Sequence, residues 1–170
     1  MIVLGIDPGL AHTGFGVVRG DGSRLAALDG GVIETSSRAA GEDRLARILV
    51  EIGGILDRHE PSAVAIEDLY FGQNVRSAFA VGQARGVVMA AAGARGIACH
   101  AYTPQQVKSA VCGSGRAGKA QVGRMVAALL SLAEPAASDH AADALAVAIC
   151  HVNRAPMAAA VVSSAKVVRA

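Results

Sequence analysis

The apolar and polar positions in the first 35 residues predict three short strands. Residues 1–7, 13–19 and 25–35 are rich in apolar and β-branched side chains, a composition typical of strands. Between the second and third of these segments, the sequence GDGS at 20–23 predicts a turn. The pattern therefore predicts a three-stranded antiparallel meander at the start of the chain.

From Gly41 onward, the spacing of apolar residues changes to the period of a helix. The residues that follow this period are Leu45, Ile48, Leu49, Ile52, Ile55 and Leu56. Strands and helices then alternate along the rest of the chain. Strands are expected at 62–67 and 96–102, and helices at 74–95, from Thr103-Pro104, at 120–132 and from Ser138-Asp139 to about Val152. This alternation predicts an α/β fold whose sheet has about five strands.

The length and composition of the chain indicate a single folded unit. A chain of 170 residues can form one domain with a substantial core, and it contains no internal repeat. Its 52% hydrophobic and 18% charged residues argue against a disordered protein. We expect residues 1–154 to form one domain and residues 155–170 to form a flexible C-terminal tail.

The cysteines and the absence of membrane signals bear on the location of the protein. Cys99, Cys112 and Cys150 show no CxxC spacing, which favours free thiols in a reducing compartment over disulfides or a zinc site. No stretch has the length and apolar character of a membrane span, and the N-terminus lacks the features of a signal peptide. We therefore expect a cytoplasmic protein without a membrane partner.

The distribution of charge says more than the formal net charge of +2. The 65 residues between Asp68 and Glu134 contain no acidic residue. They contain seven basic residues: Arg76, Arg85, Arg95, Lys108, Arg116, Lys119 and Arg124. Scattered, solvated side chains would explain a short segment of this kind. Over so long a segment, we interpret the excess positive charge as a surface for a polyanion such as nucleic acid.

Two of the predicted strands end in a carboxylate. The first strand ends at Asp7, and the strand at 62–67 ends at Glu67. If these strands are parallel neighbours, both acids lie at the edge of the sheet where α/β folds bind ligands. Adjacent carboxylates raise each other's pKa unless a cation holds them together. Oxygen ligands of this kind suit Mg²⁺ or Mn²⁺.

The last predicted helix supplies further ligands. His140 lies three residues before Asp143 and Asp139 lies four residues before it, so either pair shares one helical face. The apolar residues 144–149 must be buried, which brings the start of this helix close to the sheet. Asp139 as a helix cap and His140 as a surface residue are alternative interpretations. Capping explains Asp143 poorly, because it lies one turn inside the helix.

Acids from two strand ends and one helix predict a site for two metal ions that hydrolyses a phosphodiester. Basic side chains near such a site would stabilise the negative charge that develops on the phosphate. Lys108 and Lys119, beside the glycine-rich segment 112–119, are the candidates for this role.

Several motifs occur in order along residues 1–153. They are GIDPGxxxTGxGV at 5–17, AIED at 65–68, GQARGV at 82–87, QVK at 106–108 and HAADALAVAI at 140–149. In this combination the chain resembles the RuvC family of Holliday-junction resolvases. The resemblance implies a ribonuclease H-like fold over residues 1–154, with a five-stranded mixed sheet and helices on both faces.

The same resemblance implies an activity and a set of partners. The activity is that of a crossover junction endodeoxyribonuclease, which makes paired, metal-dependent nicks in four-way DNA junctions during recombination and repair. The expected cofactor is Mg²⁺ or Mn²⁺, with two ions in each active site. The expected partners are a second copy of the chain in a homodimer, and the RuvA and RuvB branch-migration proteins.

The resemblance also assigns the metal ligands. The metal-binding acids of the family correspond to Asp7, Glu67 and Asp143. A fourth position, three residues before the last acid, is often Asp in the family and is His140 here, with Asp139 as the alternative ligand. Because imidazole binds transition metals better than it binds magnesium, we expect manganese to support activity at least as well. We also expect activity to fall as the pH drops through the histidine range near ~6.5.

The segment DLYFGQNVRS, which begins at Asp68, resembles the junction-contacting stretch of the family. Tyr70 and Phe71 are expected to stack on an unpaired base, although core packing would explain either ring alone. The expected phosphate contacts are Arg76, Lys108, Arg116 and Lys119. The small residues between 80 and 94 fit close packing on the sheet or, by the resemblance, the dimer interface.

Other protein classes share part of the pattern. An ATPase related to actin and Hsp70 shares the DPGxxxTG turn, but such folds need two duplicated lobes and a much longer chain. A smaller nuclease relative of the same fold shares the early motifs, but the long segment without acids argues against it. A catalytically silent DNA-binding module leaves the converging acids unexplained.

Overall fold

The computed structural model describes residues 1–22, 24–68, 75–134 and 136–167, and it contains one five-stranded sheet. The strands are β1 (Ile2–Asp7), β2 (His12–Asp21), β3 (Arg24–Glu34), β4 (Ala63–Glu67) and β5 (Ala98–Tyr102), in the order β3-β2-β1-β4-β5. The first three strands are antiparallel, whereas β4 is parallel to both β1 and β5. The predicted meander and the mixed sheet are both confirmed.

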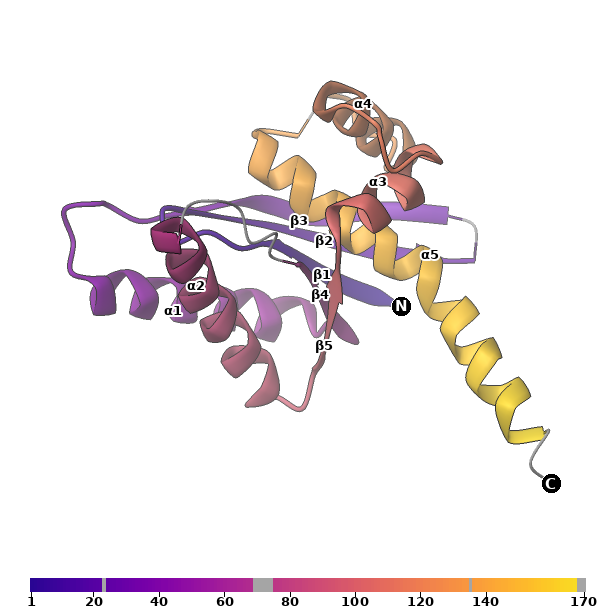
Figure 1. The fold of residues 1–170 in the computed structure, drawn as a ribbon, viewed down its shortest axis with the longest axis horizontal. Helices are drawn as coiled ribbons and strands as arrows, with labels where there is room; N and C mark the ends of the chain where they lie inside the picture. Colours follow the sequence, from indigo (N-terminus) through magenta and orange to yellow (C-terminus); the bar gives the residue numbers. More distant parts are fainter. Residues whose placement is uncertain (23, 69–74, 135, 168–170) are drawn as a thin grey trace.

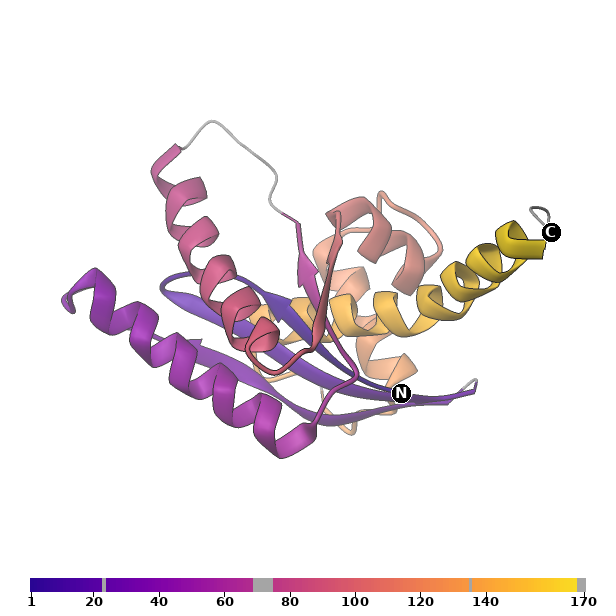
Figure 2. The same ribbon diagram turned by 90° about the horizontal axis from the view of Figure 1, so that it is seen from below.

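The helices form a layer on each face of the sheet (Figure 1). One layer contains α1 (Gly41–His59) and α2 (Val75–Gly93), which Figure 2 shows together in front of the sheet. The other layer contains α3 (Pro104–Cys112), α4 (Lys119–Leu129) and α5 (Asp139–Val167). The predicted arrangement of helices on both faces is therefore confirmed.

The side chains of β1 explain why its sequence is almost entirely apolar. Val3 packs in the cluster under α3, α4 and α5, whereas Leu4 and Ile6 pack in the cluster under α1 and α2. All three side chains are fully buried. A central strand covered on both faces has no solvent-facing side until its end, and Asp7 is placed at that end.

Glycines in β1 and β2 allow α5 to lie directly on the sheet. A Cβ at Gly5 would come within 2.0 Å of the carbonyl oxygen of Ala144, and a Cβ at Gly14 within 2.1 Å of that of His140. At Gly16 a Cβ would meet the Leu145 side chain at 2.7 Å. The glycines of the motif GIDPGxxxTGxGV thus leave part of the sheet surface without side chains, and the backbone of α5 packs directly on this part.

The predicted end of the last helix near Val152 is wrong, because α5 continues to Val167. Residues 155–167 show no amphipathic pattern and include Pro156, so the spacing of apolar residues does not predict this part of the helix. The division into a domain of residues 1–154 and a flexible tail stays a prediction. None of the described helices combines the length and apolar character that crossing a bilayer requires.

Replacing Gly5 by alanine tests the contact between β1 and α5. The added Cβ would overlap the backbone of α5, so we expect Gly5→Ala to lower the free energy of unfolding by about 1–3 kcal/mol or more. The matched control is Gly54→Ala in α1, where a Cβ meets nothing within 4 Å and should stabilise the helix by about 0.5–1 kcal/mol. Urea denaturation measures both values, and equal effects of the two substitutions would contradict the close contact.

Candidate active site

Asp7 and Glu67 lie side by side at one edge of the sheet. Ile6 of β1 pairs with Ile66 of β4, and each acid is the next residue of its strand. Both acids share the sheet face with Gly5 and Ala65, the face that α5 covers. We call this edge, together with the first turns of α5, the acid edge. The predicted neighbourhood of the two strand-end acids is confirmed.

The first turn of α5 brings His140 to Asp7. The Nδ1 atom of His140 lies 2.7 Å from Oδ2 of Asp7, so the two side chains share a hydrogen bond across the gap between helix and strand. The ring of His12, at the start of β2, stacks on the His140 ring with centroids 5.5 Å apart and an interplanar angle of 6°. His140 is therefore held between an acid and a second imidazole.

Lys119 at the start of α4 faces two acids of α5. Its Nζ atom lies 3.2 Å from Oδ2 of Asp139 and 3.5 Å from Oδ2 of Asp143. Asp139 is exposed, with 78% of its side chain accessible, while that of Asp143 is 31% accessible. Asp143 thus points inward from the helix, as expected, and Lys119 compensates part of its charge.

Like charges at the acid edge disfavour the ionised form of Glu67. Burial, followed by the negative charges of Asp7 and Asp143, raises the pKa of Glu67 to about 7, against the opposing effect of Lys108 and Lys119. Burial also raises the pKa of Asp143, although Lys119 counteracts it. The three acids therefore influence one another electrostatically, as expected of neighbouring carboxylates.

The predicted ligands share an edge but do not form a ready coordination shell. Within the described part of the chain, no group of three His, Cys, Asp or Glu side chains is arranged to hold a metal ion. Asp7 faces His140 and Asp143 faces Lys119 instead. Assignment of Asp7, Glu67, His140 and Asp143 as metal ligands stays a prediction.

The residues predicted to bind DNA are placed unevenly. Lys108 on α3 and Lys119 on α4 are close enough to the acid edge for their charges to lower the pKa of Glu67. Arg116 is exposed in the connection between these helices. Arg76 belongs to the first turn of α2, while Tyr70 and Phe71 lie outside the described residues.

Two residues near the site were not singled out by the sequence interpretation. His12 belongs to the alternate positions of β2 that face α5, a pattern that Gly14 and Gly16 already mark in the sequence. Arg85 donates a hydrogen bond from Nη1 to the main-chain oxygen of Glu67, at 3.0 Å. The contact between Arg85 and Glu67 becomes apparent only from the packing of α2 against β4 in the structure.

Comparison with known proteins agrees with the fold. The family model for crossover junction endodeoxyribonuclease RuvC matches residues 3–151. A relative of the same description from Geobacter sp. (strain M21) is 48% identical over 159 residues, which cover 94% of this chain and 96% of that protein.

Two solved structures from Thermus thermophilus are also similar. The RuvC structure has a TM-score of 0.86 and 41% identity, and covers 93% of this chain and 97% of its own. RuvC in complex with Holliday junction substrate has a TM-score of 0.86 and 39% identity, with 92% and 96% covered. These matches confirm the predicted ribonuclease H-like fold.

The raised pKa of Glu67 predicts how the stability of the metal-free protein depends on pH. Between pH 4.5 and about 7 the folded state binds a proton that the unfolded state has released, so stability falls as the pH rises through this window. Glu67→Gln removes this penalty and should stabilise the metal-free protein at pH 8 by up to about 3 kcal/mol.

Urea denaturation at pH 5 and pH 8, with EDTA present, measures this effect. Glu51→Gln, at an exposed position of α1, is the matched control and should leave the pH dependence as it is in the parent protein. A Glu67→Gln variant with the pH dependence of the parent protein would contradict the electrostatic description of the acid edge.

Proposed function

This chain belongs to the RuvC family of crossover junction endodeoxyribonucleases, and from that premise we propose that the acid edge is its active site. The enzyme resolves Holliday junctions by endonucleolytic cleavage of DNA. The observation that carries the assignment of the site is the position of Asp7, Glu67 and Asp143, which come from β1, β4 and α5 and influence one another's charge at one edge.

The side chains of the acid edge fit a divalent cation. Three carboxylates offer the oxygen ligands that Mg²⁺ and Mn²⁺ prefer, and His140 adds a nitrogen that favours Mn²⁺. The partners that the acids hold now are exposed, with side-chain accessibilities of 44% for His140 and 60% for Lys119. Their movement away from Asp7 and Asp143 disrupts no core packing, so the acids can turn toward a cation.

We propose two ions of Mg²⁺ or Mn²⁺, held by Asp7, Glu67, His140 and Asp143. When bound, such ions activate water and stabilise the oxygen that leaves the phosphorus. Glu67 must be ionised to contribute, which ties the occupied site to the loss of its proton. The Nδ1 atom of His140 now shares a hydrogen bond with Asp7, so His140 would hold an ion either through Nε2 or by turning Nδ1 away from Asp7.

The basic residues around the acid edge supply the surface for the DNA backbone. Lys119 lies next to the acids and can move from Asp139 to a phosphate, while Lys108 and Arg116 extend the positive surface along α3 and the following connection. Arg76, together with Tyr70 and Phe71, is proposed to contact the junction itself. This arrangement places positive charge beside the acids, which would otherwise repel the phosphate that is cut.

Removing any single carboxylate should abolish cleavage and preserve binding. For Asp7→Asn, Glu67→Gln and Asp143→Asn we expect at least a 100-fold loss of nicking, because each removes a proposed metal ligand. Junction affinity should stay the same or rise, since each change removes negative charge near phosphate. The measurement compares nicking and gel-shift affinity of a synthetic four-way junction with Mn²⁺, with Mg²⁺ and with EDTA.

A linear duplex of the same sequence is the substrate control, and Glu51→Gln is the protein control. Equal cutting of duplex and junction would point to a general nuclease. Loss of junction binding with intact cleavage chemistry would contradict the placement of these acids at the metal ions.

We also propose a homodimer that forms through α2. Two side chains of this helix are large, apolar and exposed: Phe79 at 68% and Met89 at 45%. They lie ten residues apart, and the exposed positions between them, Gln83 and Gly86, carry no charge. A two-fold symmetric pair would present two active sites to the two strands that a resolvase must cut.

RuvA and RuvB are the proposed partners, and the cytoplasm, where chromosomal DNA is replicated, is the proposed location.

Phe79→Asp should weaken the dimer because it places a charge in the apolar interface. We expect the dissociation constant of the dimer to rise at least tenfold, measured by sedimentation equilibrium over a concentration series. Val50→Asp in α1 is the matched control, since Val50 is also apolar and 72% exposed but lies on another helix. A control that dissociates as readily as the Phe79 variant would contradict the assignment of the interface to α2.

A further inference from the structure

Arg85 connects α2 to the end of the strand that carries Glu67. Its Nη1 atom donates to the main-chain oxygen of Glu67 at 3.0 Å and lies 3.3 Å from Oδ1 of Asp68. The Arg85 side chain is only 20% accessible, so the guanidinium is held largely out of solvent between helix and strand. A guanidinium withdrawn from water needs hydrogen-bond partners in the protein, and here the partners are the last residue of β4 and its neighbour.

The position of this contact along β4 makes it important for Glu67. The pairing of β4 with β1 extends to Ile66, whereas the pairing with β5 extends to Glu67, which lies opposite Tyr102. The main-chain nitrogen of Asp68 continues on the β5 side by donating to the oxygen of Tyr102 at 2.8 Å. The last residue of β4 is thus held by β5 beside it and by Arg85 from α2.

Arg85 and the Glu67 carboxylate lie on opposite sides of the sheet. Ala84, the neighbour of Arg85, packs with Ile66 in the cluster under α1 and α2. The Glu67 side chain shares the other face with Ala65, which packs in the cluster under α5. The charges that shift the pKa of Glu67 come from the acid edge, namely Asp7, Asp143, Lys108 and Lys119. Arg85 therefore acts on the main chain of Glu67 and leaves its carboxylate free for a ligand.

We propose that Arg85 is a positioning residue, which holds the main chain of Glu67 from behind the sheet and so directs its carboxylate toward Asp7 and Asp143. The inference rests on the proposed function of Glu67 as a metal ligand. It also gives the motif GQARGV at 82–87 a physical role, because this motif places an arginine on α2 where the side chain reaches the end of β4.

Substitution of Arg85 by methionine tests the proposal, with the affinity of the DNA-free protein for Mn²⁺ as the readout. Removing a group that orients a metal ligand typically costs 10–100-fold in metal affinity or activity. We expect Arg85→Met to weaken Mn²⁺ binding by about tenfold or more in calorimetric titration, and to lower kcat on the junction at saturating Mn²⁺. Arg85→Lys, which keeps the charge and one donor, should give a smaller loss and covers the case in which Arg85→Met does not fold.

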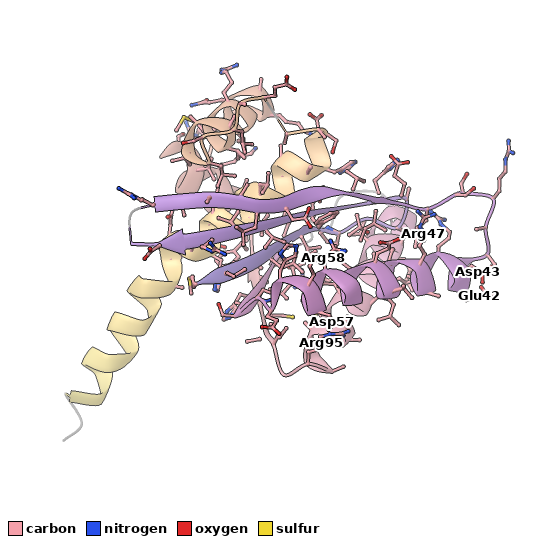
Figure 3. The ribbon with its side chains drawn as sticks, turned by 180° about the vertical axis from the view of Figure 1, so that it is seen from behind. Glu42, Asp43, Arg47, Asp57, Arg58 and Arg95 are labelled. Atoms are coloured by element: carbon pink, nitrogen blue, oxygen red, sulfur yellow. The ribbon has the colours of Figure 1, made fainter. Side chains whose placement is uncertain are left out.

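Arg95→Met is the matched control, because Arg95 lies just beyond the C-terminal end of α2, whereas Arg85 lies in the middle of the helix. Arg95 bonds Asp57 through Nε at 2.6 Å and through Nη2 at 2.9 Å. Figure 3 shows this pair near the C-terminal end of α1, far along the helix from Glu42 and Asp43 at its start. This end of α1 leads into the first residue of β4, whereas Glu67 is the last residue of β4. We expect Arg95→Met to reduce thermal stability and to change Mn²⁺ affinity by less than about twofold, within the ordinary effect of a surface change.

The possible outcomes separate this inference from the proposed function. If the Arg85 variants lose stability but keep the Mn²⁺ affinity of the parent protein, Arg85 is only structural and the proposal is overturned. An Arg95→Met variant with the same loss of affinity overturns it as well, since any loosening of α2 would then suffice. Unchanged Mn²⁺ affinity and cleavage in Glu67→Gln would contradict the assignment of Glu67 itself, whatever the Arg85 variants show.

Discussion

The close contact between α5 and the central strands is the constraint on which the rest of the structure depends. Backbone atoms of the helix lie where side chains of β1 and β2 would otherwise be, and glycine at positions 5, 14 and 16 makes this possible. An ordinary helix–sheet separation would carry the first turns of α5 away from the strand ends. The acid edge exists because a helix late in the chain can lie directly on the first two strands.

The same contact explains how charged groups are kept at the border of a tightly packed core. The residues from Ala144 to Cys150 are almost fully buried, whereas Asp139, His140 and Asp143 lie on the preceding turns of the same helix. Burial of those apolar turns fixes the direction of the helix, and its polar beginning is then directed to Asp7 and Lys119. Burial of Glu67, together with the like charges of Asp7 and Asp143, raises its pKa, so part of the folding free energy is given up at the edge. A site built at this cost is typical of functional positions.

Much of this arrangement could be predicted from the sequence, because it depends on periodicity and chain direction. The linear sequence shows two apolar strands that end in Asp7 and Glu67. It also shows a helix that changes from polar to apolar after Asp143. The partners of these side chains cannot be predicted from the linear sequence, because the His140–Asp7 and Arg85–Glu67 hydrogen bonds depend on how the layers pack. The end of α5 was also missed, because residues 155–167 show no amphipathic period and include Pro156, which is typical of a helix end.

The hydrogen bond between Asp7 and His140 joins residues 133 positions apart. During synthesis, the ribosome releases both strand-end acids long before it releases α5. A nascent chain that lacks this helix lacks His140 and Asp143, and one face of its sheet is uncovered. The acid edge can therefore form only after α5 has been synthesised and has packed on the sheet.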